Sequence, residues 1–342
     1  MPTSNPSYSA LSAFAERLGK RDAIPFDEFV DMALYDPAIG YYSIDRKRVG
    51  RDRTTDFLTS ASFGSLWGEL IVAACAKIID AERIERYAFV EIAAEPGQSI
   101  LEGVRHPFGK TRVIRLGDEI DIPSPAVVYS NEWLDARPFK RFCFIPEKDC
   151  WHEVGVTLEE DAFREQILDA SQTPGIRGLD FPVDYKSPYV VDWPTGSIRT
   201  LRALCDQPWE GLFLTFDYGL DRKTLLRERP QGTARGYFRH SMSTDLLSKV
   251  GEQDLTCHLC WDALIEVLEK SGFDSVGLSV QESFLVNHAD EKIREVFSEH
   301  ASSSARMRTL KEILHPAHMG AKFQALWAKR KSSSPKGKDG LP

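Results

Sequence analysis

Six short apolar runs constrain the fold of this chain more than any other feature. They lie at residues 87–93, 111–116, 125–131, 141–146, 189–193 and 211–219. Most have the length of a β-strand, and several are separated by stretches that can form a helix. This alternation predicts an α/β sheet. The 342 residues suffice for one core with an insertion or for two modest domains.

Three of these runs have polar residues at or near their ends. These are Glu91 in the first run, Asn131 and Glu132 at the end of the third, and Asp217 in the last. In an open α/β sheet, ligands bind beyond the carboxyl ends of the strands, so these side chains predict a site at that edge. Each acid could instead cap a helix or lie in a first helical turn, where the helix dipole favours negative charge.

The remaining segments predict a helical start, an insertion and a helical end. Apolar spacing indicates helices at 8–20, 25–35, 63–80, 260–272 and 289–300, with a late strand at 321–329. The apolar stretch 70–79 is about half the length that crosses a bilayer and predicts a buried helix. Residues 158–170 favour a polar helix within an insertion, and residues 229–242 favour a structured loop.

Charge and cysteine content exclude several classes of function. With 43 basic and 51 acidic residues the net charge is −8, which disfavours a broad nucleic-acid or membrane surface. Six scattered cysteines and no signal-peptide pattern indicate a reduced, cytoplasmic setting. Cys257 and Cys260 have C-x-x-C spacing around His258, but no second pair completes a zinc site, so no metal is predicted.

Eight motifs along the chain stand in the order of a known family. They are "FDEFVDMALYDPAIGYYS", "DFLTSASFGSLWGELI", "SNEWLDARP", "LTFDYG", "GTARGYFRH", "GEQDLTCHLCW", "GFDSVGLSVQESFL" and "MGAKFQAL". From about residue 24 to 328 the chain resembles the MidA-like S-adenosylmethionine-dependent methyltransferases. That family includes the mitochondrial protein arginine methyltransferase needed for respiratory complex I assembly.

The resemblance implies an α/β fold of the class I (Rossmann-like) methyltransferase type, with a helical N-terminal cap and a substrate-covering insertion. The implied domains are a cap and lid segment at 1–80 and a core at 81–328 with the insertion at about 147–187. A disordered tail is expected at 329–342. The family's turn after the first strand, an acid followed by G-x-G-x-G, wraps the methionine portion of the methyl donor. Small residues let the backbone approach the ligand there.

This chain departs from the family turn at two positions. Ala93 and Glu95 replace two of the three glycines, while Glu91 and Gly97 are kept. Ala93 adds one methyl group and is accommodated if its φ stays negative. Glu95 could repel the donor's carboxylate or bind its ammonium group. The acid that grips the ribose hydroxyls is not in its usual place, and Asp118 or Glu119 could substitute for it.

The resemblance also implies site residues. The implied donor-binding residues are Thr59, Ser60, Glu91, Ala93, Gly97 and Asn131, with Asp56 in the same lid-like segment. The implied catalytic residues are Glu132, Asp135, Asp217 and His240. Carboxylates such as Glu132 and Asp135 can hold a planar guanidinium with paired hydrogen bonds, as an arginine substrate requires.

Several of these residues have a structural alternative. Asp135 could cap the turn that follows it, and His240 could be a packed loop histidine rather than a proton acceptor. His258 could hydrogen-bond with Asp254 or Thr256. None of these alternatives is decided by the residue pattern.

Two functions follow from these motifs. The first is a methyltransferase that uses S-adenosylmethionine to methylate a protein, with arginine as the expected acceptor. The second is a methyltransferase-like protein that has lost donor binding and acts by binding a protein partner. In both cases the partner is a protein, a homodimer is possible, and neither nucleic acid nor membrane insertion is expected.

Overall fold

The computed structural model describes residues 9–44, 63–79, 81–169, 179–299, 305–315, 320 and 322–331. Contacts between Cα atoms divide the chain into two compact units, each made of several segments. Unit 1 is Met1–Ser62, Glu132–Thr200 and Tyr218–Leu264; unit 2 is Phe63–Asn131, Leu201–Asp217 and Ile265–Pro342. These units do not test the predicted limits at 80 and 328, which stay a prediction.

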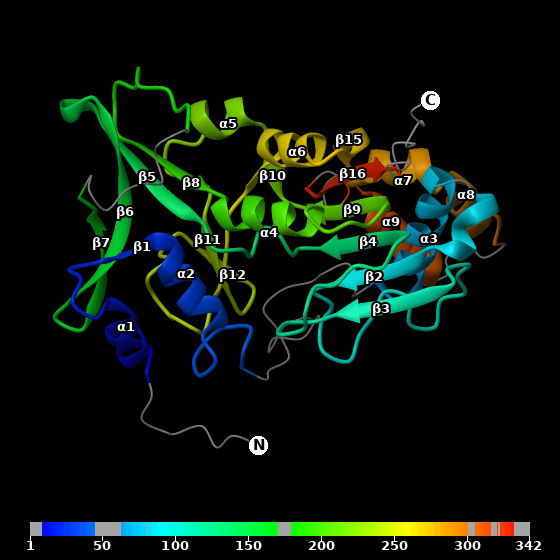
Figure 1. Cartoon of the computed structure of the whole chain (residues 1–342), viewed down its shortest axis with the longest axis horizontal. Coiled ribbons are helices and arrows are strands. Elements are labelled where there is room, and N and C mark those ends of the chain that lie inside the picture. The colour runs from blue at the N-terminus through cyan, green and yellow to red at the C-terminus, as the bar shows by residue number, and fades with distance from the viewer. Residues whose placement is uncertain are drawn as a thin grey trace, which may run out of the picture. The chain divides into compact units, whose positions relative to one another are not determined.

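Unit 2 contains the sheet that the apolar runs predicted. Its strands are β2 (Ala88–Ile92), β3 (Lys110–Ile114), β4 (Ala126–Asn131), β9 (Gly211–Asp217), β15 (Asp274–Val280) and β16 (Gln324–Arg330). Their order is β15-β16-β9-β4-β2-β3, as the side-by-side arrows of Figure 1 show. Strands β3, β2, β4 and β9 are parallel, whereas β16 is antiparallel to β9 and to β15.

The order of these strands marks a ligand-binding edge. From β2 the chain passes to β3 on one side and then returns to β4 on the other side of β2. The strand order therefore reverses at β2. In open α/β sheets, ligands bind beyond the carboxyl ends of the strands at this kind of switch point.

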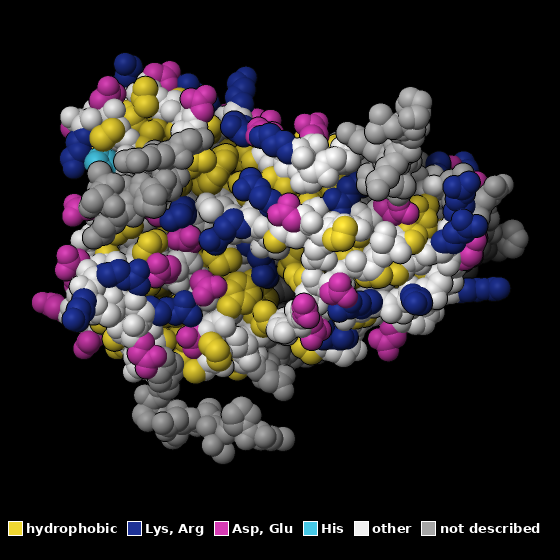
Figure 2. Space-filling view, viewed as in Figure 1, with side chains coloured by type: hydrophobic (Ala, Val, Ile, Leu, Met, Phe, Trp, Pro, Cys, Tyr) yellow, Lys and Arg dark blue, Asp and Glu magenta, His cyan; other side chains and the backbone are white. Residues whose placement is uncertain are grey.

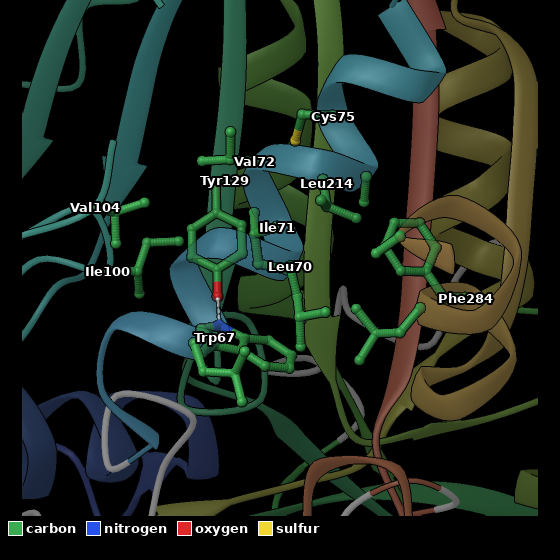
Figure 3. Close-up of a cluster of buried hydrophobic side chains, with 14 of the residues drawn as sticks. Trp67, Leu70, Ile71, Val72, Cys75, Ile100, Val104, Tyr129, Leu214 and Phe284 are labelled. Atoms are coloured by element: carbon green, nitrogen blue, oxygen red, sulfur yellow. Dashed lines mark hydrogen bonds between the residues drawn. The ribbon is translucent and has the colours of Figure 1, made fainter. Parts of the chain in front are cut away.

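The core of unit 2 lies between its sheet and its helices. The helices are α3 (Ser65–Ile79), α7 (Gln281–His288), α8 (Asp290–Ser298), α9 (Ala305–Leu314) and the 3-10 helix η2 (Ala81–Arg86). Figure 3 shows α3 side chains meeting Tyr129 of β4 and Leu214 of β9. Trp67 Nε1 donates a hydrogen bond to Tyr129 Oη at 2.8 Å within this apolar cluster. The expected helix at 63–80 is confirmed.

Unit 1 holds the N-terminal helices and a second, antiparallel sheet. Its helices are α1 (Ala10–Leu18), α2 (Phe26–Tyr35), α5 (Arg222–Arg227) and the 3-10 helix η3 (Pro146–Lys148); α4 (Thr195–Cys205) and α6 (Trp261–Lys270) contain residues of both units. Its main sheet comprises β1 (Ile24–Pro25), β5 (Lys140–Ile145), β6 (Cys150–Glu159), β7 (Ala162–Ile167) and β8 (Tyr189–Trp193). Smaller pairings join β10 (Gly219–Leu220) to β14 (Leu259–Cys260), and β11 (Arg235–Phe238) to β12 (Ser241–Ser243) and β13 (Asp254–Thr256).

A buried carboxylate organises the loop at 229–242, which was expected to be structured. Asp192 of β8 is fully buried, and its Oδ1 accepts from Arg141 Nε at 2.8 Å. Its Oδ2 accepts from the backbone N–H groups of Thr233 at 2.7 Å and Ala234 at 2.8 Å. This carboxylate fixes the chain just before β11, so the expectation of a structured loop is confirmed.

The polar helix predicted at 158–170 is wrong. That segment forms the end of β6, a two-residue turn and β7, with Glu159 opposite Ala162. Glu160 and Asp161 have φ of 47° and 62°, as a type I′ hairpin turn requires. The sequence pattern resembled an exposed helix because Glu160 and Asp161, which form the turn, are charged residues of the kind found on a helix surface.

Two further features do not follow from the sequence pattern. The residues after Gly97 form a series of turns, in which Glu102 N donates to Ser99 O and Val104 N to Leu101 O. The runs at 141–146 and 189–193 are strands, as predicted, but they belong to the antiparallel sheet of unit 1. An apolar run indicates a strand without indicating which sheet it joins.

The double substitution Glu160→Asn/Asp161→Gly in the hairpin turn should raise the free energy of unfolding by about 1 kcal/mol. Asn and Gly adopt positive φ with less strain than Glu and Asp, for which the left-handed conformation costs about 1–2 kcal/mol per residue. The urea midpoint of the double variant measures this. Glu147→Asn, at an exposed residue without positive φ, is the control. An unchanged midpoint for the double variant would contradict the turn assignment.

Candidate functional site

Three of the predicted site residues share one edge of the unit 2 sheet. Glu91 is the fourth residue of β2, Asn131 ends β4 and Asp217 ends β9. The three strands are adjacent and parallel, so their carboxyl ends meet at the same edge. The structure therefore brings Glu91, Asn131 and Asp217 to the ligand-binding edge that the sequence predicted.

The carboxylate of Glu91 is engaged by the turn that follows β2. Its Oε2 accepts from Ser99 Oγ at 2.6 Å, and both oxygens accept from Ile100 N at 3.1–3.2 Å. Burial raises the pKa of Glu91, and the hydrogen bonds from Ser99 and Ile100 oppose that shift. The side chain closes residues 92–99 into a loop with fixed ends.

The backbone of this loop corrects one expectation. Ala93 was expected to have a negative φ, but its φ is 62°. Its N–H donates to Ile114 O at 2.8 Å, continuing the ladder with β3, and the residue is exposed. Gly97 has φ of 72°, and a Cβ at that position would meet nothing within 4 Å. The loop is thus open beside Gly97, while Glu95 is half-buried.

A basic and an acidic residue follow β3 beside this loop. Arg115 Nη2 donates to Gln98 O at 3.1 Å, and its positive charge opposes the rise in the pKa of Glu91 that burial causes. Asp118 Oδ2 accepts from Arg115 N at 2.8 Å, which holds Asp118 in the turn directly after β3. This position is the one where the sequence left a choice between Asp118 and Glu119. Arg115 is not among the site residues that the sequence predicted.

A second group of acids lies within unit 1. Glu132 has φ of 48°, and Asp135 is 4% exposed with its carbonyl accepting from Cys257 N at 3.1 Å. Burial raises the pKa of Tyr237; the charges of Asp135, Asp254 and Glu132 raise it further, and the charge of Arg235 opposes them. The predicted residues Glu132 and Asp135 therefore lie within electrostatic range of one tyrosine hydroxyl, together with Asp254 and Arg235.

The N-terminal segment supplies residues that the sequence analysis missed. After α2 the chain folds back, because Tyr42 N donates to Leu34 O at 2.8 Å. The ring of Tyr42 stacks on Tyr35 with centroids 5.5 Å apart, and its Oη donates to Asp254 Oδ1 at 2.9 Å. The "GYYS" motif was a signal of this contact, but only the fold shows that it reaches Asp254.

The remaining predicted residues are dispersed or outside the described part of the chain. His240 is exposed at the tip of the β11–β12 hairpin, where Arg239 and His240 both have positive φ. Asp56, Thr59 and Ser60 lie outside the described residues. Their predicted roles are therefore still predictions.

The C-x-x-C segment forms no metal centre within the described residues. Cys257 and Cys260 are buried free thiols, and the described ranges contain no group of three or more potential metal ligands. His258 Nδ1 is buried without a hydrogen-bond partner in this part of the chain, so this nitrogen does not form the expected bond to Asp254 or Thr256 there. Burial, assisted by Arg235 and Arg229, lowers the pKa of His258 to about 4.

Two observations concern the expected partners: the distribution of charge on the surface and the length of the helices. On the face drawn in Figure 2, basic and acidic side chains are interspersed among apolar ones. Among the described residues, none of the helices has the length and hydropathy of a membrane span. The protein partner, the homodimer and the cytoplasmic setting stay predictions.

The segment that contains this edge of the sheet matches a known protein family. The family model described as "Putative S-adenosyl-L-methionine-dependent methyltransferase" matches residues 80–279, more than half of the 342 residues. The chain belongs to this family. The match includes β2 with its following loop and the acids after β4.

Two solved structures share the fold of this methyltransferase family member. A superfamily member from Burkholderia thailandensis, solved bound to S-adenosyl-homocysteine, is similar with a TM-score of 0.80 and 23% identity over 94% of this chain and 91% of that chain. A native structure of an uncharacterized superfamily protein from the same organism gives a TM-score of 0.77 and 23% identity, with coverage of 94% and 91%. No curated protein sequence matches significantly. The expected α/β methyltransferase fold with N-terminal helices is confirmed.

The residues of the unit 2 edge fit the methyl donor of the methyltransferase family. The loop beside Gly97 is open, its ends are fixed by Glu91, and Arg115 lies next to it. Arg115 therefore places a positive charge beside the loop that also carries Glu95.

His258 should make stability depend on pH below neutrality. Its pKa is lowered to about 4 in the folded state, against about 6.5 in an unfolded chain. Its contribution is present above the unfolded pKa and is lost as the pH falls toward the folded one. From about pH 7 to about pH 4.5, wild type should lose roughly 2 kcal/mol more than His258→Leu. Urea unfolding of both proteins measures this, and equal losses would refute it.

Proposed function

We propose that this protein is an S-adenosylmethionine-dependent methyltransferase that methylates arginine in a protein substrate. The observation that carries the proposal is the open loop held by Glu91 at the switch point of the unit 2 sheet. Family membership supports the donor, and the acids of unit 1 support a cationic acceptor. The relative from Burkholderia thailandensis binds S-adenosyl-homocysteine, the demethylated form of this donor.

Residues of unit 2 would hold the donor. Loop 93–99 would face its methionine portion, with Arg115 placed to attract the carboxylate and Asn131 at the neighbouring strand end. Asp118, fixed after β3, would accept hydrogen bonds from the ribose hydroxyls. When bound, S-adenosylmethionine supplies an electrophilic methyl group on a sulfonium.

Residues of unit 1 would hold the substrate. Glu132 and Asp135 would accept hydrogen bonds from the guanidinium, which fixes its plane and increases electron density on the attacking nitrogen. Bound S-adenosylmethionine would supply the methyl group to that nitrogen, so the orientation of the guanidinium by Glu132 and Asp135 would contribute most to the rate. The proton that the nitrogen loses would pass to one of these two carboxylates.

A second candidate is a methyltransferase-like protein that binds a protein partner without the donor. One observation favours it. The loop is followed by turns in place of a helix, so it lacks the helix N-terminus that commonly stabilises bound anions. Donor binding distinguishes the two candidates directly.

Calorimetric titration with S-adenosyl-homocysteine should show saturable binding at one site. Ser99→Ala should weaken that binding about tenfold, because it removes one of the hydrogen bonds that hold Glu91 and the loop. Ser12→Ala, in helix α1 of unit 1, should leave the affinity unchanged. Absence of wild-type binding at millimolar ligand would favour the partner-binding candidate.

Glu132→Gln should abolish methyl transfer with little change in stability. The assay uses labelled S-adenosylmethionine and a randomised arginine-containing peptide pool, with a citrulline-substituted pool as the neutral comparison. Glu160→Gln is the matched control, because Glu160 also has positive φ but lies at the tip of the β6–β7 hairpin. Full activity of Glu132→Gln would remove this residue from the catalytic group. Transfer to the citrulline pool would argue against arginine as the acceptor.

A further inference from the structure

The loop after β2 is supported from behind by helix α3. A Cβ added at Gly68 would lie 1.9 Å from Ile100 O and 2.9 Å from Val104 Cγ2. A contact of 1.9 Å is sterically forbidden, so only glycine lets α3 come this near to the turn. Gly68 is buried within a helix, where glycine otherwise lowers helix stability. Its presence there serves the contact with the turn.

The backbone of Ile100 is therefore held on two sides. Its N–H donates to the carboxylate of Glu91, and its carbonyl lies against the backbone of α3 at Gly68. Figure 3 shows Ile100 and Val104 beside α3, where they belong to the same apolar cluster as Trp67. The turn is thus held between the carboxylate of Glu91 and helix α3.

Helix α3 itself is tied to the sheet at the same end. Trp67, the neighbour of Gly68, donates from Nε1 to Tyr129 Oη at 2.8 Å, and both side chains are buried. Tyr129 belongs to β4, which pairs with β2 on the side opposite β3. The hydrogen bond fixes the first turns of α3 relative to the strand that carries Glu91. Any displacement of α3 at Gly68 would be passed to Ile100.

We infer that Gly68 is a positioning residue for the methyl donor, because the close packing of α3 against Ile100 replaces the helix that usually supports this loop. The inference rests on the proposed function, since it takes loop 93–99 to face the methionine portion of the donor. Gly68 does not touch the donor. It sets the position of the turn whose N–H and hydroxyl groups hold Glu91.

Gly68→Ala should weaken S-adenosyl-homocysteine binding at least tenfold and change methylthioadenosine binding less than twofold. Methylthioadenosine lacks the amino acid portion that the loop would face, so a displaced loop affects only the first ligand. Ala73→Gly is the control: it lowers helix stability within α3 without adding an atom at the turn. It should lower the melting temperature and keep the ratio of the two affinities at the wild-type value.

Unchanged S-adenosyl-homocysteine affinity in folded Gly68→Ala would overturn the inference, and so would an equal loss for both ligands, which a general structural effect produces. If Gly68→Ala does not fold, Trp67→Phe tests the same support by removing the bond to Tyr129. It should weaken S-adenosyl-homocysteine severalfold more than methylthioadenosine, and an unchanged ratio would overturn the inference. A wild type that binds neither ligand refutes the proposed function instead, so the two failures are distinguishable.

Discussion

The hydrogen bonds between the Glu91 carboxylate and the turn at Ser99 and Ile100 are the interaction on which the candidate donor site depends. The carboxylate is buried at the end of β2, and burying such a group costs free energy unless hydrogen-bond donors satisfy it. Two donors from one short turn meet that need. The loop therefore keeps its shape without two of the glycines and without the helix that such a turn usually has.

The residues at the three glycine positions of the family turn differ in their effect on the loop. Ala93 adopts positive φ and continues the hydrogen-bond ladder with β3, a strained conformation that the neighbouring strand and the Glu91 bonds stabilise. Gly97 keeps the open side of the loop free of side-chain atoms. Glu95 adds negative charge, and Arg115 offers positive charge to the same loop through Gln98.

The sequence predicted the strands well and the elements between them less well. The apolar runs ending at Glu91, Asn131 and Asp217 are parallel strands, and their polar ends share one edge. The segment at 158–170 was assigned the wrong element, because acidic turn residues at 160 and 161 resemble an exposed helix when the pairing partner is unknown. Asp254 and Tyr42 were not joined, since 212 residues separate them along the chain.

The sequence by itself determined the periodicity of the strands, the polar residues at their ends and the family motifs, because these depend on local spacing. Only the tertiary structure decided what those residues contact: that Glu91 holds its own loop, that Gly68 admits Ile100, and that Asp135 and Asp254 lie near Tyr237. Such contacts depend on which backbone segments approach each other, and long-range approach has no signature in the spacing of residues along one segment.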